Sequence, residues 1–103
     1  MIIMEVSVAP VGGQNASMGD LVAETLKCVK SHGLHFALNA MGTVIEGDDL
    51  GKLLQVAREM HEVCFKRGSP RAITSIRIDD RRDKSLTMAY KVDSVLERAG
   101  LAS

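Results

Sequence analysis

The sequence predicts a single α+β domain of order βαββαβα, in which two helices cover one face of a four-stranded antiparallel sheet. Four segments have the alternating pattern of strands, and three longer segments have apolar residues at helical spacing. A helix follows a single strand twice, as in the split βαβ arrangement, whose right-handed crossovers place both helices on one sheet face. A chain of 103 residues supports one hydrophobic core, so residues 1–103 are expected to form one domain.

The four strand segments are separated by residues that favour turns. Pro10 is expected to end the pairing of the first strand, because proline has no N–H to donate. Residues 11–16 then form a loop, and residues 39–42 form an irregular, glycine-containing connection between the second and third strands. We expect strands over residues 2–9, 34–38, 43–46 and 72–79.

The helical segments begin and end at residues with capping chemistry. Ser17 can cap the first helix, and Gly33 suits the left-handed position after its end. Asp48 or Asp49 opens the second helix, and Asp83 caps the third. The expected apolar stripes are Met18, Val22, Leu26 and Val29 in the first helix, Leu50, Leu53, Leu54, Ala57, Met60 or His61, and Cys64 in the second, and Leu86, Ala89 or Tyr90, Val92, Val95, Leu96 and Ala99 in the third.

This topology leaves one face of the sheet without helices. Glu5 and Arg77 can pair on that face, although a solvated ion pair contributes only about 0–1 kcal/mol. A surface that mixes apolar and charged side chains needs a cover, and we expect a second copy of the same chain. On the first and last strands, this open face carries Ile3, Glu5, Ser7, Ile73, Ser75 and Arg77.

The composition argues against several classes of partner. Thirteen Lys and Arg balance thirteen Asp and Glu, so no net positive field attracts nucleic acid or anionic membranes. The N-terminal segment lacks the features of a signal peptide, and no stretch nears the ~20 apolar residues of a membrane span. We therefore expect a soluble, cytoplasmic protein. In that reducing compartment, Cys28 and Cys64 are expected to be buried thiols.

Histidines and cysteines come close together in two places. Cys28, His32 and His35 lie around the end of the first helix, and His61 and Cys64 lie one helical turn apart. Neither set has a convincing fourth ligand or the paired spacing of a structural zinc site, so we expect no metal and no cofactor. The sequence contains no nucleophile–base pattern, phosphate loop or zinc-protease motif, and we expect no catalytic activity.

Three segments together resemble the thiamine-binding protein family. The first is residues 5–10 with the following loop and Ser17. The second is the run Met-Gly-Thr-x-x-Glu-Gly at residues 41–47. The third is the run Thr-x-Ile-Arg-Ile-Asp-x-Arg-x-Asp-Lys at residues 74–84, followed by the helical residues 91–95. The two runs are specific in combination, and the resemblance covers essentially the whole chain.

The resemblance implies a ferredoxin-like βαββαβ fold with an extra C-terminal helix. It also implies dimers that pack sheet to sheet, a homotetramer built from them, and non-catalytic binding of thiamine or its hydroxymethylpyrimidine half near subunit contacts. By position, Ser17 matches the family's serine after the first loop. Met41, Gly42 and Thr43 match the connection between the second and third strands.

The side chains near these positions suit a ligand of that chemistry. Thiamine carries a cationic thiazolium and an aminopyrimidine, which call for a carboxylate, hydrogen-bonding groups and an apolar surface. Met41 offers a soft, polarizable contact. The polar candidates are Glu5, Ser17, Asn39, Thr43 and Glu46.

Each candidate also has a purely structural interpretation. Ser17 is equally explained as a helix cap and Gly42 as a turn residue. Glu5 and Glu46 are compatible with solvated charges on a strand face, and Met41 with core packing. The chemistry of these residues therefore allows the ligand hypothesis without deciding it.

Other functions remain open at this stage. A structural or regulatory homo-oligomer that binds another metabolite or a protein partner predicts the same assembly. RNA binding on the sheet requires exposed aromatic side chains, which the first and last strands lack. A phosphatase requires an anion cradle beside the first loop, for which Gly12 and Gly13 alone are weak support.

Overall fold

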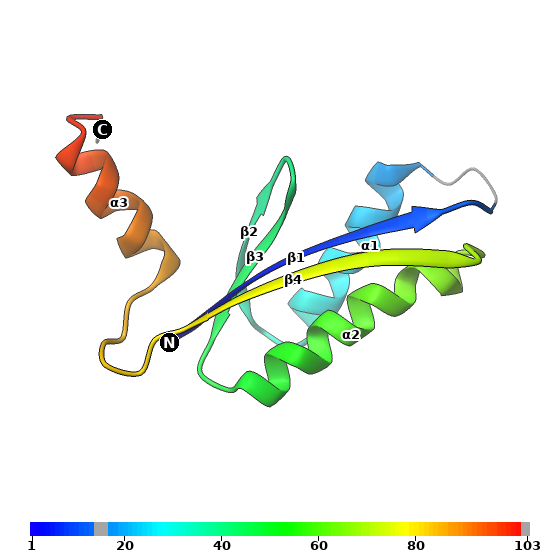
Figure 1. The fold of residues 1–103 in the computed structure, drawn as a ribbon, viewed down its shortest axis with the longest axis horizontal. Coiled ribbons are helices and arrows are strands. Elements are labelled where there is room, and N and C mark those ends of the chain that lie inside the picture. The colour runs from blue at the N-terminus through cyan, green and yellow to red at the C-terminus, as the bar shows by residue number, and fades with distance from the viewer. Residues whose placement is uncertain (14–16, 102–103) are drawn as a thin grey trace.

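The structure, a computed structural model, describes residues 1–13 and 17–101. Its elements follow the predicted order, and the predicted α+β class is confirmed (Figure 1). Asn15 and its neighbours in the predicted loop lie outside the described residues. The elements are β1 (Ile2–Val11), α1 (Met18–Ser31), β2 (His35–Asn39), β3 (Gly42–Gly47), α2 (Leu50–Lys66), β4 (Arg71–Asp80) and α3 (Met88–Arg98).

The four strands form one antiparallel sheet in the order β2-β3-β1-β4. Glu5 of β1 lies opposite Val44 of β3 on one side and opposite Arg77 of β4 on the other. The predicted proximity of Glu5 and Arg77 is therefore confirmed. Figure 1 shows α1 and α2 against one face of the sheet, whereas α3 stands apart from both helices.

Alternate residues of β1 form the centre of the hydrophobic core. Ile2, Met4, Val6 and Val8 are each at most 9% exposed, and they lie on the face that the helices cover. Burial of apolar surface stabilises a fold by about 25 cal/mol per Å², so this face positions the two helices. The helices contribute Leu21, Thr25 and Val29 from α1, and Leu53, Val56, Ala57, Met60, Val63 and Cys64 from α2.

The predicted apolar stripes of the first two helices are partly wrong. Met18 is 50% exposed, and Leu21 is buried in its place. In α2, Leu54 is 44% exposed, while Val56 is fully buried. On each helix, more than one set of apolar residues recurs at a spacing of three or four. Packing against the sheet, rather than spacing alone, decides which set faces the core.

Pro10 does not end β1, contrary to the prediction. It lies opposite Ala72, and Val11 lies opposite Arg71. The pairing of β1 with β3 extends only as far as Val6, so the later part of β1 has a neighbouring strand on one side alone. Proline is tolerated there, because its missing N–H can face the side without a strand.

The connection between β2 and β3 is also shorter than predicted. Asn39 pairs with Gly42, which leaves Ala40 and Met41 as a two-residue connection. The predicted four-residue connection is therefore corrected, and the hairpin holds Asn39 and Gly42 in the sheet.

The third helix begins later than predicted. Thr87, rather than Asp83, caps α3, and its hydroxyl accepts a hydrogen bond from the Tyr90 N–H at 3.1 Å. Asp83 instead accepts hydrogen bonds from Arg81, two residues before it. Leu86 precedes the helix and is not part of its apolar stripe. The close charged partner explains why Asp83 stays in the turn.

The ends of the first two helices largely agree with the prediction. Asp49 caps α2, because its Oδ1 accepts from the Lys52 N–H at 3.2 Å. Gly33 follows α1 with a φ of 68°, which favours glycine. Ser17 occupies the N-cap position of α1, but its side chain makes no capping hydrogen bond. In the part of the chain that the structure describes, no helix is long and apolar enough to cross a membrane.

Two methionines provide a matched test of the core. Met4 is completely buried, whereas Met41 is 88% exposed. We expect Met4→Ala to lower the free energy of unfolding by about 2–5 kcal/mol, because it removes buried methylenes and leaves a cavity. Met41→Ala should change it by no more than about 0.5 kcal/mol. Chemical denaturation of both variants measures the difference, and equal effects would contradict this core.

Candidate ligand-binding pocket

A pocket of about 130 Å³ lies where the β2–β3 hairpin meets β1 and the start of α1. It brings together Asn39, Met41, Gly42 and Thr43, four of the seven predicted binding residues. Ser17 directly precedes a lining residue but does not line the pocket itself. The lining comprises Val6, Ser7 and Val8 of β1, Met18, Val22 and Thr25 of α1, Met60 of α2, and residues 38–43 of the hairpin.

Gly42 allows the hairpin to lie close to β1. A Cβ at this position would come within 3.1 Å of the Val6 carbonyl oxygen and 3.7 Å of the Ser7 Cβ. The φ of Gly42 is not positive, so the glycine serves close approach rather than an unusual backbone conformation. This gives a physical reason for the glycine in the Met-Gly-Thr run.

The pocket contains polar groups that have no partner within the described part of the chain. Thr43 is only 3% exposed, and neither Thr43 nor Asn39 takes part in a side-chain hydrogen bond there. Thr25 differs, because its hydroxyl donates to the Val22 carbonyl at 2.7 Å. Asn39 is exposed and the Thr43 hydroxyl is not among the fully enclosed atoms that lack a partner in the described residues, so both side chains are open to a hydrogen-bonding ligand.

The rest of the lining is apolar, and sequence reasoning did not assign it to a site. Met18 and Val22 belong to the stripe expected to face the core, and the structure places them around the pocket instead. Their exposure follows from this position at the start of α1. The lining contains no Asp, Glu, His, Lys, Arg or Cys, so the pocket is neutral.

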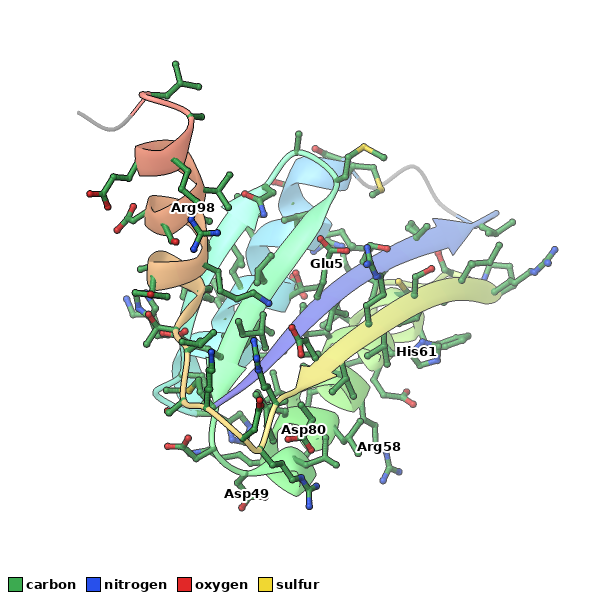
Figure 2. All side chains as sticks on the ribbon, turned by 60° about the vertical axis from the view of Figure 1, so that its left-hand side comes forward. Glu5, Asp49, Arg58, His61, Asp80 and Arg98 are labelled. Carbon is green, nitrogen blue, oxygen red and sulfur yellow. The ribbon has the colours of Figure 1, made fainter. Side chains whose placement is uncertain are left out.

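The structure places Glu5 and Glu46 away from this pocket, on the open face of the sheet. Glu5 lies 3.9 Å from Arg77, and Figure 2 shows its side chain on the face opposite the helices. Glu46 accepts a hydrogen bond from the Met88 N–H at 2.8 Å, which stabilises the start of α3. The predicted binding residues thus fall into two groups on opposite faces.

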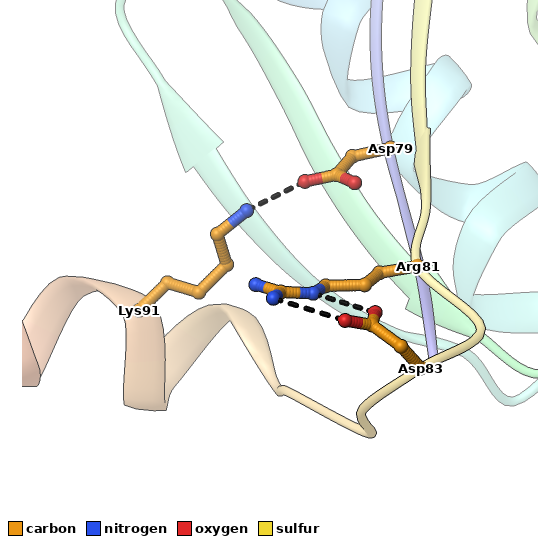
Figure 3. A network of polar contacts seen from close by, with 4 residues as sticks. All are labelled: Asp79, Arg81, Asp83 and Lys91. Carbon is orange, nitrogen blue, oxygen red and sulfur yellow. Dashed lines mark hydrogen bonds and ion pairs between the residues drawn. The ribbon is translucent and has the colours of Figure 1, made fainter.

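A shallow hollow of about 260 Å³ surrounds Glu5 on the open face. Arg77, Asp79 and Lys91 also line it. Lys91 of α3 donates to the Asp79 carboxylate at 2.6 Å, and this contact ties the helix to the sheet (Figure 3). The open face therefore carries several charges of both signs, in contrast to the pocket.

A larger hollow of about 650 Å³ lies at the start of α2, beside the charged turn that follows β4. Two acidic groups of this turn are already paired. Arg82 donates to Asp80, and Arg81 donates to Asp83 (Figure 3). These hydrogen bonds hold the pKa of both carboxyls below their usual values. We therefore favour the smaller pocket, where Asn39 and Thr43 have no side-chain hydrogen bond within the described part of the chain, over the larger hollow.

Two of the three histidines make separate polar contacts. His32 Nε2 lies 2.8 Å from Glu59 Oε2, and His61 Nδ1 lies 2.6 Å from the Thr74 hydroxyl. Among residues 1–13 and 17–101, no group of three His, Cys, Asp or Glu side chains could hold a metal ion. Burial raises the pKa of Cys28, and the negative charge of Glu59 adds to this rise.

A family model described as thiamine-binding protein matches residues 4–96. That range includes the whole lining of the pocket. The chain belongs to the thiamine-binding protein family. A UPF0045 protein of Staphylococcus xylosus is 44% identical, with 92% of each chain covered. A UPF0045 protein of Methanothermobacter thermautotrophicus is 35% identical, over 95% of this chain and 99% of its own.

Solved structures of similar proteins agree with this fold. The hypothetical protein MJ1052 from Methanocaldococcus jannaschii has a TM-score of 0.79 at 34% identity, covering 97% of this chain and 96% of its own. A protein from Thermotoga maritima, described as a candidate in thiamine biosynthesis or salvage, has a TM-score of 0.73. The match covers 91% of this chain and 97% of that protein. Its 15% identity means that this second likeness shows the fold alone.

The two thiols provide a test of this part of the structure. Cys64 is fully buried, and burial raises the pKa of its thiol as well as that of Cys28. Less thiolate is therefore present near pH ~8.5, the usual thiol pKa. We expect alkylation of the native protein at that pH to be at least about tenfold slower than after unfolding. Mass spectrometry of each cysteine measures both rates, and equal rates would contradict the burial.

Proposed function

We propose that this protein binds thiamine, or its hydroxymethylpyrimidine half, without catalysing a reaction. The observation that carries the proposal is the neutral pocket in which Asn39 and Thr43, without side-chain hydrogen bonds to residues 1–13 or 17–101, lie beside an apolar wall. Family membership supports the same ligand class, and the residues of the Met-Gly-Thr run form one side of the pocket.

The size of the pocket favours one ring. A cavity of about 150 Å³ lined by apolar side chains holds benzene. The pocket here has about 130 Å³, which suits a single six-membered heteroaromatic ring. The pyrimidine half of thiamine therefore enters the pocket, and the second ring of the intact vitamin stays outside it.

The charge distribution supports the same orientation. A cation buried without a partner is strongly disfavoured, and the lining offers no carboxylate to the thiazolium. The exocyclic amine and ring nitrogens of the pyrimidine are neutral donors and acceptors, which match an amide and hydroxyls. Met41, 88% exposed at the rim, is available to the part of the ligand outside the pocket.

The same proposal includes assembly through the open face of the sheet. α3 has 11 residues, and an isolated helix of that length is marginal in water. Its Tyr90, Val92 and Val95 are each more than half exposed. A second copy of the chain that covers α3 and the open face would bury these side chains, and dimers of this kind would pair into the tetramer.

Variants on the two faces test where the ligand binds. We expect Thr43→Val to weaken binding of hydroxymethylpyrimidine about five- to tenfold, because it removes one hydroxyl and keeps the shape of the side chain. Glu5→Gln should leave the affinity unchanged, because Glu5 lies on the opposite face. Calorimetric titration of each variant with hydroxymethylpyrimidine and with thiamine measures both effects.

The titration of the unaltered protein decides between the proposal and its alternative. No heat and no thermal shift at millimolar concentrations of either compound would contradict ligand binding, since ligand at about 100 times its dissociation constant adds about 2.7 kcal/mol. A structural or regulatory oligomer that binds another metabolite or a protein would give that negative result while still assembling.

The assembly through α3 has a test of its own. Val92 and Val95 lie on one side of the helix and are 57% and 60% exposed. We expect the double change Val92→Lys and Val95→Lys to shift the protein toward smaller species at micromolar concentration, because it puts charge into the proposed contact. Light scattering measures the mass. Asp93→Lys is a control on the same helix, and a lone protomer in the unaltered protein would contradict the proposal.

A further inference from the structure

Exposed apolar side chains border the neutral pocket. Met18 of α1, with Leu38 and Met41 of the β2–β3 hairpin, are each at least half exposed, and all three line the pocket. The hairpin turn and the start of α1 lie toward the top of Figure 1. A single exposed apolar side chain is ordinary, whereas several around one pocket mark a contact surface. Met18, Leu38 and Met41 therefore form an apolar rim that the core does not use.

The methionines of the pocket differ in depth. Three of the six methionines in the sequence line it, one each from α1, the hairpin and α2. Met60 of α2 is buried in the core, so it closes the inner end, whereas Met18 and Met41 stand at the rim. Met4 and Met88, which do not line the pocket, are both buried. The sulfur atoms that a ligand meets first are therefore those of the rim.

Aromatic side chains do not contribute to this pocket in the described part of the chain. The aromatic residues of the sequence are Phe36, Phe65 and Tyr90, which lie on β2, α2 and α3 outside the lining. Cations and ring systems are commonly held by aromatic faces, which are missing here. A thioether sulfur is polarizable, accepts weakly and makes favourable contacts with rings. The methionines are therefore the groups that can take this role.

The rim and the inner pocket meet different parts of thiamine. This inference rests on the proposed function, in which the pyrimidine enters the pocket and the thiazolium stays outside it. A cation at an exposed rim keeps much of its hydration, so it does not need a buried carboxylate. We propose that the thioethers of Met18 and Met41 hold this second ring at the rim and thereby favour intact thiamine over its pyrimidine half.

The two affinities separate the rim from the rest of the site. Asn39 and Thr43 meet the pyrimidine, which thiamine and hydroxymethylpyrimidine share, so they contribute to the binding of both compounds. The rim meets only the ring that thiamine adds. The ratio of the two affinities therefore depends on Met18 and Met41.

Replacement of the sulfur atoms tests the rim. The double change Met18→Leu and Met41→Leu keeps apolar side chains there and removes both thioethers. We expect it to weaken binding of thiamine about tenfold in calorimetric titration, and each single change about threefold, with the affinity for hydroxymethylpyrimidine unchanged. Met88→Leu is the matched control, because Met88 lies at the start of α3 and does not line the pocket. It should alter neither affinity.

A neutral analogue separates charge from shape. In the thiophene analogue of thiamine, carbon replaces the charged nitrogen and the second ring keeps its size. We expect this analogue to bind the unaltered protein more weakly than thiamine does, because the attraction between sulfur and the cation is lost. The double change should then weaken its binding no more than about threefold, through loss of the remaining contacts between sulfur and ring.

The outcomes distinguish this inference from the proposed function. Equal weakening of thiamine and hydroxymethylpyrimidine by the double change, or unchanged binding of thiamine, would overturn the role of the rim while ligand binding stands. An equal loss for thiamine and its neutral analogue would overturn the attraction to the cation. No binding of hydroxymethylpyrimidine to the unaltered protein would overturn the proposed function, and the inference with it. Thermal unfolding of each variant confirms that it is folded.

Discussion

Burial of one face of β1 is the constraint on which the rest of the structure depends. Met4 and Val6 are almost completely inaccessible at the centre of the sheet, and both helices pack over them. Since the side chains of a strand alternate, the residues between them necessarily project from the other face. The bare face, with Glu5 and its partner Arg77, is therefore a direct consequence of how the core forms.

Local chemistry accounts for the parts of the fold that the sequence predicted well. The cap of Asp49 and the left-handed Gly33 depend on a few neighbouring residues, and strand alternation depends only on the residues themselves. The orientation of α1 was not predictable in this way, because Met18 and Leu21 both belong to plausible apolar stripes. Pro10 was misjudged because its tolerance depends on where β3 stops, which is a property of the assembled sheet.

Alternation also explains why the predicted binding residues separate. Thr43 pairs with Val6 and faces the helices, whereas Glu46 pairs with Ile3 and faces the open side. The two residues are three positions apart on one strand, so a period of two places them on opposite faces. That signal was present in the sequence. The contribution of Met60 to the pocket was not, because it depends on how α2 crosses the sheet.

The pocket differs from the surrounding core because it contains polar side chains without hydrogen-bond partners among the described residues, and this difference connects the fold to function. Thr43 is 3% exposed and has no side-chain hydrogen bond within the part of the chain that the structure describes. Its hydroxyl is not among the fully enclosed atoms without a partner there, so it stays open to a partner that enters the pocket. A neutral ring with donors and acceptors supplies the missing partners, while charge stays on the opposite face, where solvent or another protomer accommodates it.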